Sequence, residues 1–419
     1  MSTVRTSPTM PKIKPAPADA DVINVEELKT QYINTQINPY LTDNIKLVKP
    51  PCSHFSKCGG CQLQHIPVEH QPFVKKRMLE AIFNQATIDP SIIEDTRSLT
   101  EHAFNYRNKA DFTSKTFDDQ IHLGFTPYGG RGQLIEADQC PILMPVINET
   151  LTAVRKTITN VKELARKLVS VTIRASQVNN ESFILYHSKY KEENIYGEIT
   201  KATQKQTDKL KGGTFIKKRR EHTIGSSVIT EDIGSLKLSY TVRTFFQANI
   251  YMLENLCNAV EELITPCKQK EVLLDIYCGV GLFALKFGSL FSEVYGIEST
   301  PASIKMAIKN GIDNGMPSIP FYRDTAEERL AQLLRTGIYP DVIILDPPRS
   351  GLHKNVIASL AGLKPSPDLI LVSCNPHSLV LNIKDLQKAG YILERIIPID
   401  MFPQTEHLEV VAKMTRNVS

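Results

Sequence analysis

The chain has 419 residues, a hydrophobic fraction of 42% and a formal net charge of +4, which suits two or three globular domains. No apolar run approaches the about 20 residues that cross a bilayer, and the first residues lack the apolar core of a signal peptide. We therefore expect a cytoplasmic protein that does not associate with membranes. The small net charge argues only weakly for an acidic partner.

The N-terminal part of the chain has no sustained pattern of apolar residues. Residues 1–47 mix Pro, Thr, Lys and Asp, and the stretch from Met10 to Pro17 is rich in proline. This composition predicts a disordered tail, because it offers too little apolar surface to bury. We expect ordered structure to begin near residue 48, at the start of a domain that runs to residue 240.

Four of the eight cysteines differ from the others in their placement. Cys52, Cys58 and Cys61 lie in one short stretch, and Cys140 precedes a proline, as in loops that bind metal clusters. Two glycines between Cys58 and Cys61 let the backbone turn so that both thiolates reach one ion or cluster. Four thiolates suit tetrahedral zinc or a [4Fe–4S] cluster, and the spacing does not separate these. The alternative is four unrelated buried cysteines.

A helix is predicted from Pro67 to Phe83. Its apolar residues recur at close to the 3.6-residue helical period, namely Phe73, Met78, Leu79, Ile82 and Phe83. The basic run of Lys75, Lys76 and Arg77 falls on the other side, which we expect to face solvent. We expect this helical region, about residues 67–97, to pack on the C-terminal domain.

From about Phe104 to Tyr240 the chain changes to short alternating runs of the kind that form strands. The predicted strands are 110–113, 121–125, 168–173 and 182–186, with a helix over 150–164. The domain of residues 48–240 is therefore predicted to be β-rich and α+β, and we expect its sheet to be antiparallel.

Basic residues gather in two parts of this domain. Between residues 201 and 220 eight basic residues accompany one acid, and four of them are contiguous: Lys217, Lys218, Arg219 and Arg220. Such a run forms either a solvated loop or a surface that contacts phosphates. At the start of a predicted strand, a base can stack on Tyr106 while phosphates bind Arg107 and Lys109. An ordinary strand start is the alternative.

From Phe245 onward strands and helices alternate. Strands are predicted at 271–275, 293–297, 318–322, 341–345 and 369–373, with a late antiparallel pair near 391–399 and 408–414. Helices are predicted at 247–264, 281–287, 301–314, 326–335, 354–361 and 378–388. This order indicates an α/β, Rossmann-like, doubly wound sheet of the kind found in adenosylmethionine-dependent methyltransferases, over residues 241–419.

The first strand of this region runs into a turn with glycines at Gly279 and Gly281. Such a turn lets a ligand approach the backbone, but on its own it is weak evidence. The third glycine of dinucleotide-binding turns is replaced by Ala284, and the next strand ends at Glu298, where ribose hydroxyls would lie. Together these features favour adenosylmethionine over NAD. For Glu298, an exposed helix N-cap is the alternative.

Two further strands end in polar loops. Asp346 is followed by two prolines and Arg349, and the prolines fix the direction of the carboxylate. Such loops in methyltransferases hold the target base beside the methyl donor, and a rigid crossover turn is the alternative. Cys374 follows the apolar run 369–372, so it lies where a nucleophile is expected, at the carboxyl end of a buried strand.

A thiol at this place suits methylation of uracil at C5. Uracil C5 is a poor nucleophile, but a thiolate that adds at C6 turns the ring into an enolate-like carbon nucleophile. A base must then remove the C5 proton so that the thiol can leave. We assign Cys374 as the nucleophile and Glu409 as the base, because Glu409 begins an apolar strand where burial raises a carboxyl pKa. We expect His407 to orient its neighbours. A surface strand edge is the alternative for both.

Taken in order, these motifs resemble the RNA uracil-C5-methyltransferase family, in particular its iron–sulfur branch that acts on large-subunit ribosomal RNA. The resemblance covers most of residues 48–414. It rests on the motifs at 52–61, 104–109, 139–141, 245–249, 275–281, 346–349, 373–376 and 402–409. So many short motifs in one order are highly specific.

The resemblance implies a [4Fe–4S] cluster on Cys52, Cys58, Cys61 and Cys140. It implies S-adenosyl-L-methionine contacts from Gln247, Tyr277, Glu298, Asp324 and Asp346, around the turn of Gly279 and Gly281. It also implies Cys374 as nucleophile and Glu409 as base. Several relatives begin with a small β-barrel RNA-binding domain, for which the segment before Cys52 is too short. RNA binding is therefore expected to rest on the central domain and on the basic loop 201–220.

We accordingly expect a monomeric enzyme that methylates C5 of a specific uridine in 23S ribosomal RNA. The same chemistry on tRNA is the nearest alternative. RNA cytosine-C5 methylation, which also uses an attacking cysteine, is a second alternative. A non-enzymatic iron–sulfur protein that binds RNA is a third.

Overall fold

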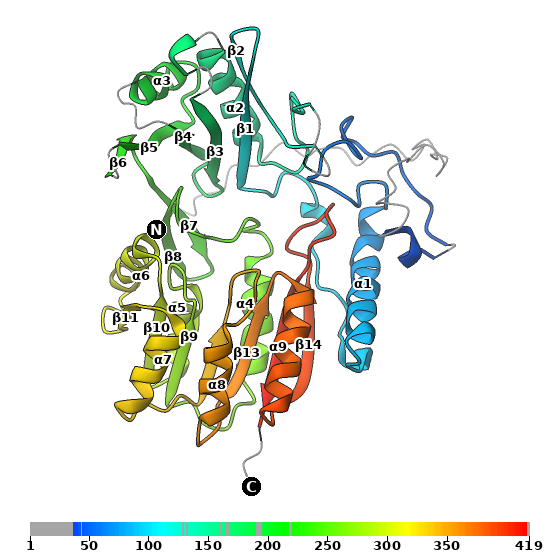
Figure 1. The fold of residues 1–419 in the computed structure, drawn as a ribbon, viewed down its shortest axis with the longest axis vertical. Coiled ribbons are helices and arrows are strands. Elements are labelled where there is room, and N and C mark those ends of the chain that lie inside the picture. Colours follow the sequence, from blue (N-terminus) through cyan, green and yellow to red (C-terminus); the bar gives the residue numbers. More distant parts are fainter. Residues whose placement is uncertain are drawn as a thin grey trace, which may run out of the picture.

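The structure is a computed structural model that describes residues 37–416, except 43, 128–129, 131–132, 160, 165–166, 190–194 and 218–219. Most of the predicted tail, residues 1–36, lies outside the described residues. Two large sheets occupy opposite ends of the molecule, with helix α1 (Gln71–Gln85) beside the lower one (Figure 1). In the part of the chain that is described, no helix has both the length and the apolar character needed to cross a membrane.

The C-terminal sheet has seven strands in the order β11-β10-β9-β12-β13-β15-β14. The strands are β9 (Val272–Ile276), β10 (Glu293–Glu298), β11 (Phe321–Arg323), β12 (Val342–Leu345), β13 (Asp368–Ser373), β14 (Ile392–Ile399) and β15 (Glu409–Thr415). Strands β9 to β13 run parallel, whereas β15 is antiparallel to both of its neighbours, β13 and β14. The predicted α/β sheet with a late antiparallel pair is confirmed.

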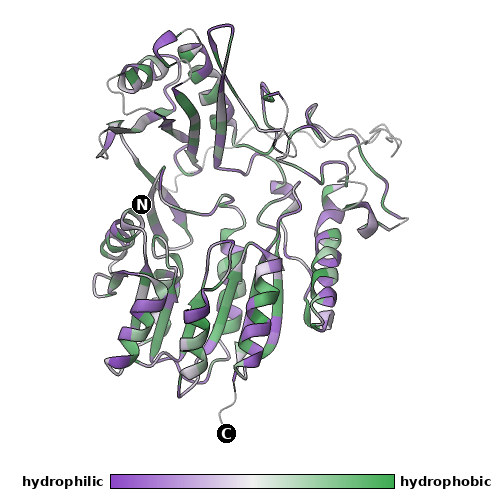
Figure 2. Cartoon of the chain, in the orientation of Figure 1, coloured by the Kyte–Doolittle hydropathy of each residue, from purple (hydrophilic) through white to green (hydrophobic). Residues whose placement is uncertain are grey.

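Helices cover both faces of this sheet because alternate residues of each strand point to opposite sides. Val342 and Ile344 pack with α4 (Leu253–Ile264), α5 (Leu282–Phe287) and α6 (Pro301–Asp313). Ile343 and Leu345 pack with α1 and with α7 (Ala326–Arg335), α8 (Lys354–Gly362) and α9 (Pro376–Lys388). Figure 2 shows the resulting hydrophobic strands between helices of mixed hydropathy.

Helix α4 begins at Leu253, and the prediction of a helix from residue 247 is wrong for its first six residues. These residues form a loop that is held to the central sheet. The Asn108 side chain donates a hydrogen bond to the Gln247 carbonyl at 3.0 Å, and the Asn108 backbone N–H donates to the Ala248 carbonyl. Contacts with another part of the fold replace the first helical turn.

The central sheet has six strands in the order β2-β1-β3-β4-β5-β6. They are β1 (Lys109–Phe117), β2 (Gln120–Gly124), β3 (Leu168–Ser176), β4 (Glu181–Ser188), β5 (Leu210–Lys217) and β6 (Arg220–Gly225). Helices α2 (Pro145–Ile158) and α3 (Ile195–Gln204) pack against it. The expected antiparallel arrangement holds except for β4 and β5, which are parallel because α3 forms a crossover between them.

A two-stranded hairpin, β7 (Val228–Ile233) and β8 (Leu236–Thr241), leads from the central sheet to the C-terminal sheet. Arg174 of β3 is buried at this junction. Its guanidinium donates to the carbonyls of Thr244 at 2.6 Å and Phe246 at 2.9 Å, and it lies 4.4 Å from the centre of the Tyr240 ring. A buried arginine needs such partners, so these contacts tie the central sheet to the loop that carries Gln247.

The segment that contains the first three cysteines packs against α1. Residues Ile37 and Leu47, which the prediction assigned to the tail, are buried in a cluster with Phe55, Leu63 and Val74. A short 3-10 helix, Asn38–Tyr40, lies between them. Ordered structure therefore includes residues before 48.

Helix α1 corrects the prediction in one respect. Lys75, expected on the solvent side, is 1% exposed, whereas Phe73, expected on the apolar side, is 48% exposed. Lys75 is buried because it forms an ion pair with Asp400, which lies 325 residues further along the chain. A local periodicity carries no information about such a distant partner.

Candidate active site

Five of the predicted site residues gather at one edge of the C-terminal sheet. Tyr277 follows β9, Glu298 ends β10, Asp324 follows β11, Asp346 follows β12 and Cys374 follows β13. Because parallel strands point in one direction, their carboxyl ends meet at one rim, where ligands of such sheets bind. The structure therefore brings these five side chains to a single rim.

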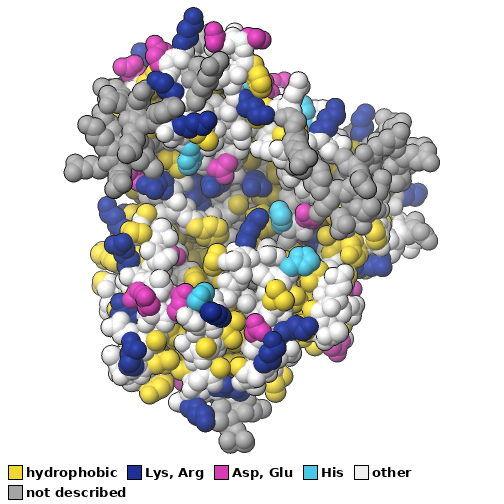
Figure 3. Space-filling view, in the orientation of Figure 1, with side chains coloured by type: hydrophobic (Ala, Val, Ile, Leu, Met, Phe, Trp, Pro, Cys, Tyr) yellow, Lys and Arg dark blue, Asp and Glu magenta, His cyan; other side chains and the backbone are white. Residues whose placement is uncertain are grey.

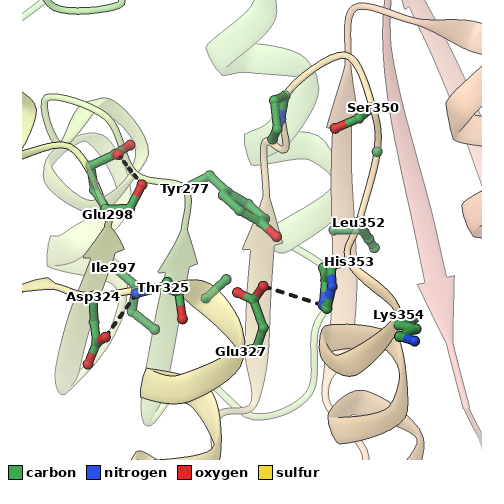
Figure 4. A pocket seen from close by; sticks show the side chains of 14 residues that line it. Tyr277, Ile297, Glu298, Asp324, Thr325, Glu327, Ser350, Leu352, His353 and Lys354 are labelled. Carbon is green, nitrogen blue, oxygen red and sulfur yellow. Dashed lines mark hydrogen bonds and ion pairs between the residues drawn. The ribbon is translucent and has the colours of Figure 1, made fainter.

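A cavity of about 460 Å³ opens at this rim. Figure 4 shows Tyr277, Glu298 and Asp324 on its wall. Glu298 Oε1 accepts a hydrogen bond from the Thr300 N–H at 2.7 Å, so the carboxylate also caps the turn before α6. Asp324 forms an ion pair with Arg329 at 3.1 Å. Both carboxylates are thus fixed by local contacts while they line the cavity.

The turn after β9 contains two glycines whose backbone angles lie in the left-handed region. Gly279 and Gly281 have φ values of 53° and 90°, which favour glycine. A Cβ atom at Gly281 would lie 3.1 Å from the ring of Phe321. Tyr277 adopts a φ of 67° and its N–H donates to the Ile297 carbonyl at 2.9 Å, which anchors the turn to β10. The two glycines shape the turn, and Tyr277 lines the cavity.

Three ionisable residues of this cavity were not predicted, namely Glu327, His353 and Lys354. Glu327, in the first turn of α7, lies 3.3 Å from His353, the N-cap of α8, across the cavity (Figure 4). No sequence motif marks them. Their only signal is that each lies at the start of a predicted helix that follows a strand of the sheet.

The remaining predicted cofactor residues do not line this cavity. Gln247 is buried in the loop before α4, where its carbonyl accepts the hydrogen bond from Asn108. Asp346 lies between the cavity and Cys374. Burial raises its pKa to about 7, and the negative charge of Glu298 adds to the rise. The Asp346 carboxylate in turn raises the pKa of the Cys374 thiol. Asp346 therefore lies close to Glu298 on one side and to Cys374 on the other.

The pairing of β13 with β15 brings Cys374 and Glu409 together. In this antiparallel pair Ser373 lies opposite Val410. One step further along the same register, Cys374 lies opposite Glu409. Among the charges that act on the thiol, that of Glu409 has the largest effect. Cys374 and Glu409, which are 35 positions apart in the sequence, thus lie at the same end of the sheet.

Burial controls the protonation of this pair. It raises the pKa of Cys374 to about 11, with Glu409 adding to the rise and Arg349 opposing it. It raises the pKa of Glu409 well above its usual range, again with Arg349 opposing. Burial lowers the pKa of His407 to about 4, and the Arg349 charge lowers it further. Without a ligand, these values favour a protonated thiol at Cys374 and a neutral imidazole at His407 at pH 7, and burial shifts Glu409 toward its neutral form.

Cys374 also opens onto a second cavity of about 300 Å³. Its wall is formed by the first turn of α9, by α1 and by the segment before β15, and includes Arg349, His377, Glu406 and His407. Cys374 is therefore reachable from outside, and it is not sealed in the apolar core.

The four predicted metal ligands line a third cavity, of about 180 Å³, between the N-terminal segment and the central sheet. Burial raises the pKa of Cys61 to about 12 and that of Cys140 to about 11, and the other cysteines add to both rises. Thiolates that repel one another in this way lie close together. Within the described residues, however, no three His, Cys, Asp or Glu side chains are placed to hold a metal ion.

The predicted RNA contacts are only partly described. Arg107 is half-buried and lines the cysteine cavity, and Lys109 forms an ion pair with Asp111 at 3.6 Å. Lys217 and Arg220 are paired at the end of the β5–β6 hairpin. Their side chains, together with Lys218 and Arg219, lie outside the described residues.

Base stacking on Tyr106 is excluded by its burial. The ring is 0% exposed, and its hydroxyl donates a hydrogen bond to the Pro403 carbonyl at 3.0 Å. Tyr106 is therefore a structural link between the central sheet and the segment before β15. Other basic side chains remain available, since Figure 3 shows Lys and Arg (dark blue) along the hollow between the two ends of the molecule.

A family model described as tRNA (uracil-5-)-methyltransferase matches residues 69–417. An uncharacterized RNA methyltransferase of Clostridium acetobutylicum is 30% identical and is matched over 88% of this chain and 84% of its own length. One from Staphylococcus aureus is 31% identical, over 87% and 84%.

One solved structure is similar over most of the chain. The crystal structure of Pyrococcus abyssi tRNA (uracil-54, C5)-methyltransferase in complex with S-adenosyl-L-homocysteine has a TM-score of 0.67 and 25% sequence identity. The match covers 86% of this chain and 85% of that one. The likeness therefore includes both sheets, not the C-terminal sheet alone.

The raised pKa of Cys374 predicts how fast this thiol reacts with iodoacetamide. Only the thiolate reacts, so below a pKa of about 11 the rate should rise about tenfold per pH unit between about pH 7 and pH 9. Replacing Arg349 by Met should lower the rate at fixed pH, because the guanidinium favours the thiolate. Mass spectrometry of the Cys374 peptide measures both. A rate that levels off near pH 8 would contradict the burial argument.

Proposed function

The chain belongs to the tRNA (uracil-5-)-methyltransferase family, and from this premise we propose that it transfers a methyl group from S-adenosyl-L-methionine to C5 of a uridine in 23S ribosomal RNA. Membership of this family identifies the activity class as S-adenosyl-L-methionine-dependent methylation of RNA at uracil C5. The single observation that carries the proposed chemistry is that Cys374 and Glu409 lie opposite each other at the end of the β13–β15 pair.

In the proposed first step, the Cys374 thiolate adds to C6 of the uracil ring. The electrons of the C5=C6 double bond move toward C5 and O4, and C5 becomes nucleophilic. C5 then attacks the methyl group of the donor, whose carbon–sulfur bond breaks to release S-adenosyl-L-homocysteine. Arg349 assists, because its positive charge favours the thiolate.

In the second step, Glu409 acts as the base. Its carboxylate takes the C5 proton, the electrons of that C–H bond restore the C5=C6 double bond, and the sulfur of Cys374 leaves as thiolate. A base with a raised pKa holds a proton more tightly, so burial makes Glu409 a stronger base than an exposed glutamate. The cationic sulfonium of the donor would favour ionisation of Cys374 and Glu409 when it binds nearby.

The cavity at the rim is the proposed site of the methyl donor. Tyr277, Glu298 and Asp324 line it, and Gly279 and Gly281 allow close approach of a ligand. Gln247 and Asp346 do not line this cavity, so their proposed contacts with the donor rest on the resemblance to the family. The similar Pyrococcus abyssi enzyme was solved with S-adenosyl-L-homocysteine, which supports this class of donor.

The choice of ribosomal RNA rests on the resemblance of the cysteine motifs to the iron–sulfur branch of the family. Transfer RNA is the second candidate, because the similar solved structure is that of a tRNA (uracil-54, C5)-methyltransferase. Both substrates require the same two side chains, so the chemistry does not separate them.

The purified full-length protein should form 5-methyluridine in an unmodified 23S ribosomal RNA transcript supplied with S-adenosyl-L-methionine. Digestion to nucleosides and mass spectrometry identify the product. Cys374→Ala should abolish it, whereas Cys257→Ala, a buried thiol of α4, should not. Methylation of tRNA transcripts alone would move the substrate to tRNA, and 5-methylcytidine would overturn the assignment.

We also propose that the cysteine cavity holds a [4Fe–4S] cluster. Four cysteines around one cavity suit either zinc or a four-iron cluster. The choice of the cluster rests on the resemblance of the cysteine motifs to the iron–sulfur branch of the family. Arg107 on the same wall suits an anionic cluster. The cluster would supply a covalent link between the N-terminal segment and Cys140.

Protein purified without oxygen should therefore be brown and contain about four iron and four sulfide atoms per chain. Cys61→Ser should lose the colour and most of the iron, and it should lower the yield of folded protein, since ligand binding contributes to folding. The control Cys267→Ser alters a cysteine outside the cavity and should keep the iron. Stoichiometric zinc, or full stability of the Cys61 variant, would contradict the proposal.

A further inference from the structure

The loop of residues 400–408 joins β14 to β15 and ends immediately before Glu409. It contains neither helix nor strand, so its path depends on contacts with other parts of the chain. Its carbonyl groups accept hydrogen bonds from the side chains of Asn249 and Tyr106. The backbone N–H groups of Gln62 and Leu63, directly after Cys61, both donate to its Gln404 carbonyl at 3.0 Å.

Lys75 of α1 makes three contacts with this loop. Its Nζ lies 2.6 Å from Asp400 Oδ1 and donates to the carbonyls of Phe402 and His407, each at 2.9 Å. The side chain of Lys75 is 0% exposed and that of Asp400 3%. An ammonium group has three donors and no acceptor, so the loop uses its whole hydrogen-bonding capacity. One cation therefore holds both ends of the loop.

The contacts that Lys75 makes with the loop lie close in sequence to Glu409, the proposed base. His407, whose carbonyl Lys75 holds, is two residues before Glu409. The neighbouring Lys76 differs, because its partner Asp95 is 98% exposed and such a surface pair contributes little. A buried, fully paired cation instead fixes geometry, since few alternative partners exist in the interior.

We propose that Lys75 is a positioning residue that holds Glu409 at the target ring through this loop, an inference that rests on the proposed function. Covalent attachment to RNA needs Cys374, whereas release needs Glu409. Release breaks the C5–H and C6–S bonds: the carboxylate takes the proton, the C–H electrons form the C5=C6 double bond, and sulfur leaves as thiolate. A loosened loop therefore slows release more than attachment.

The test variant is Lys75→Met combined with Asp400→Asn. Lys75→Met alone would leave a buried carboxylate without its cation and endanger folding. The double variant removes both charges and keeps the side-chain volumes similar. Lys76→Met is the matched control, and thermal melting verifies the fold of each protein.

Each protein, in excess over the RNA, is mixed with an unmodified 23S ribosomal RNA transcript and methyl-labelled S-adenosyl-L-methionine, so that a single turnover is observed. A denaturing gel follows the covalent RNA–protein complex, and free methylated RNA reports release. The double variant should attach to RNA within about twofold of the wild-type rate and release it about tenfold more slowly, so that the complex accumulates. Lys76→Met should behave as wild type.

Release at the wild-type rate would overturn the proposal. So would attachment and release that slow by the same factor, because a loss of folded protein acts on both. Glu409→Gln serves as the reference and should retain the complex. If it releases RNA at the wild-type rate, Glu409 is not the base. In that case the proposed function is at fault, independently of the result for Lys75.

Discussion

The reversed direction of one strand is the constraint on which the site depends. Strand β15 enters the sheet antiparallel between β13 and β14, so the start of β15 meets the end of β13. A thiol after one strand and a carboxyl group at the beginning of the other therefore lie at the same rim. If β15 were parallel to β13, Glu409 would lie at the opposite edge of the sheet, away from the cavity lined by Tyr277 and Glu298.

Burial controls the protonation of Cys374 and Glu409. The Arg349 guanidinium lies near the Cys374 thiol and the Glu409 carboxyl group, and Asp346 acts on both; the pKa of each acidic group is raised chiefly by burial. Several negative charges so close together are unfavourable in a buried environment, so without ligands these groups are shifted toward their protonated forms. A cationic donor would shift this balance toward thiolate and carboxylate.

Much of the fold can be predicted from the sequence, because local physics determines it. Apolar runs such as 342–345 predict strands that are covered on both faces, and the structure confirms them. Contacts over long sequence distances explain the rest. Lys75 is buried by its pairing with Asp400, and Tyr106 by its packing under the loop at Pro403. The rim position of Cys374 follows from its strand, but its register with Glu409 follows only from the order of strands in the sheet. Glu327 and His353 belong to no motif.

The central claim is that Cys374 bonds to C6 of a uracil ring while Glu409 removes the C5 proton. The most direct measurement uses RNA in which the target uridine is replaced by 5-fluorouridine, because fluorine at C5 cannot be taken away as a proton. Incubated with S-adenosyl-L-methionine, the protein should form a stable one-to-one complex, and peptide mapping should find the methylated nucleotide on Cys374. Attachment at another residue, or no covalent complex with an otherwise active protein, would contradict the account.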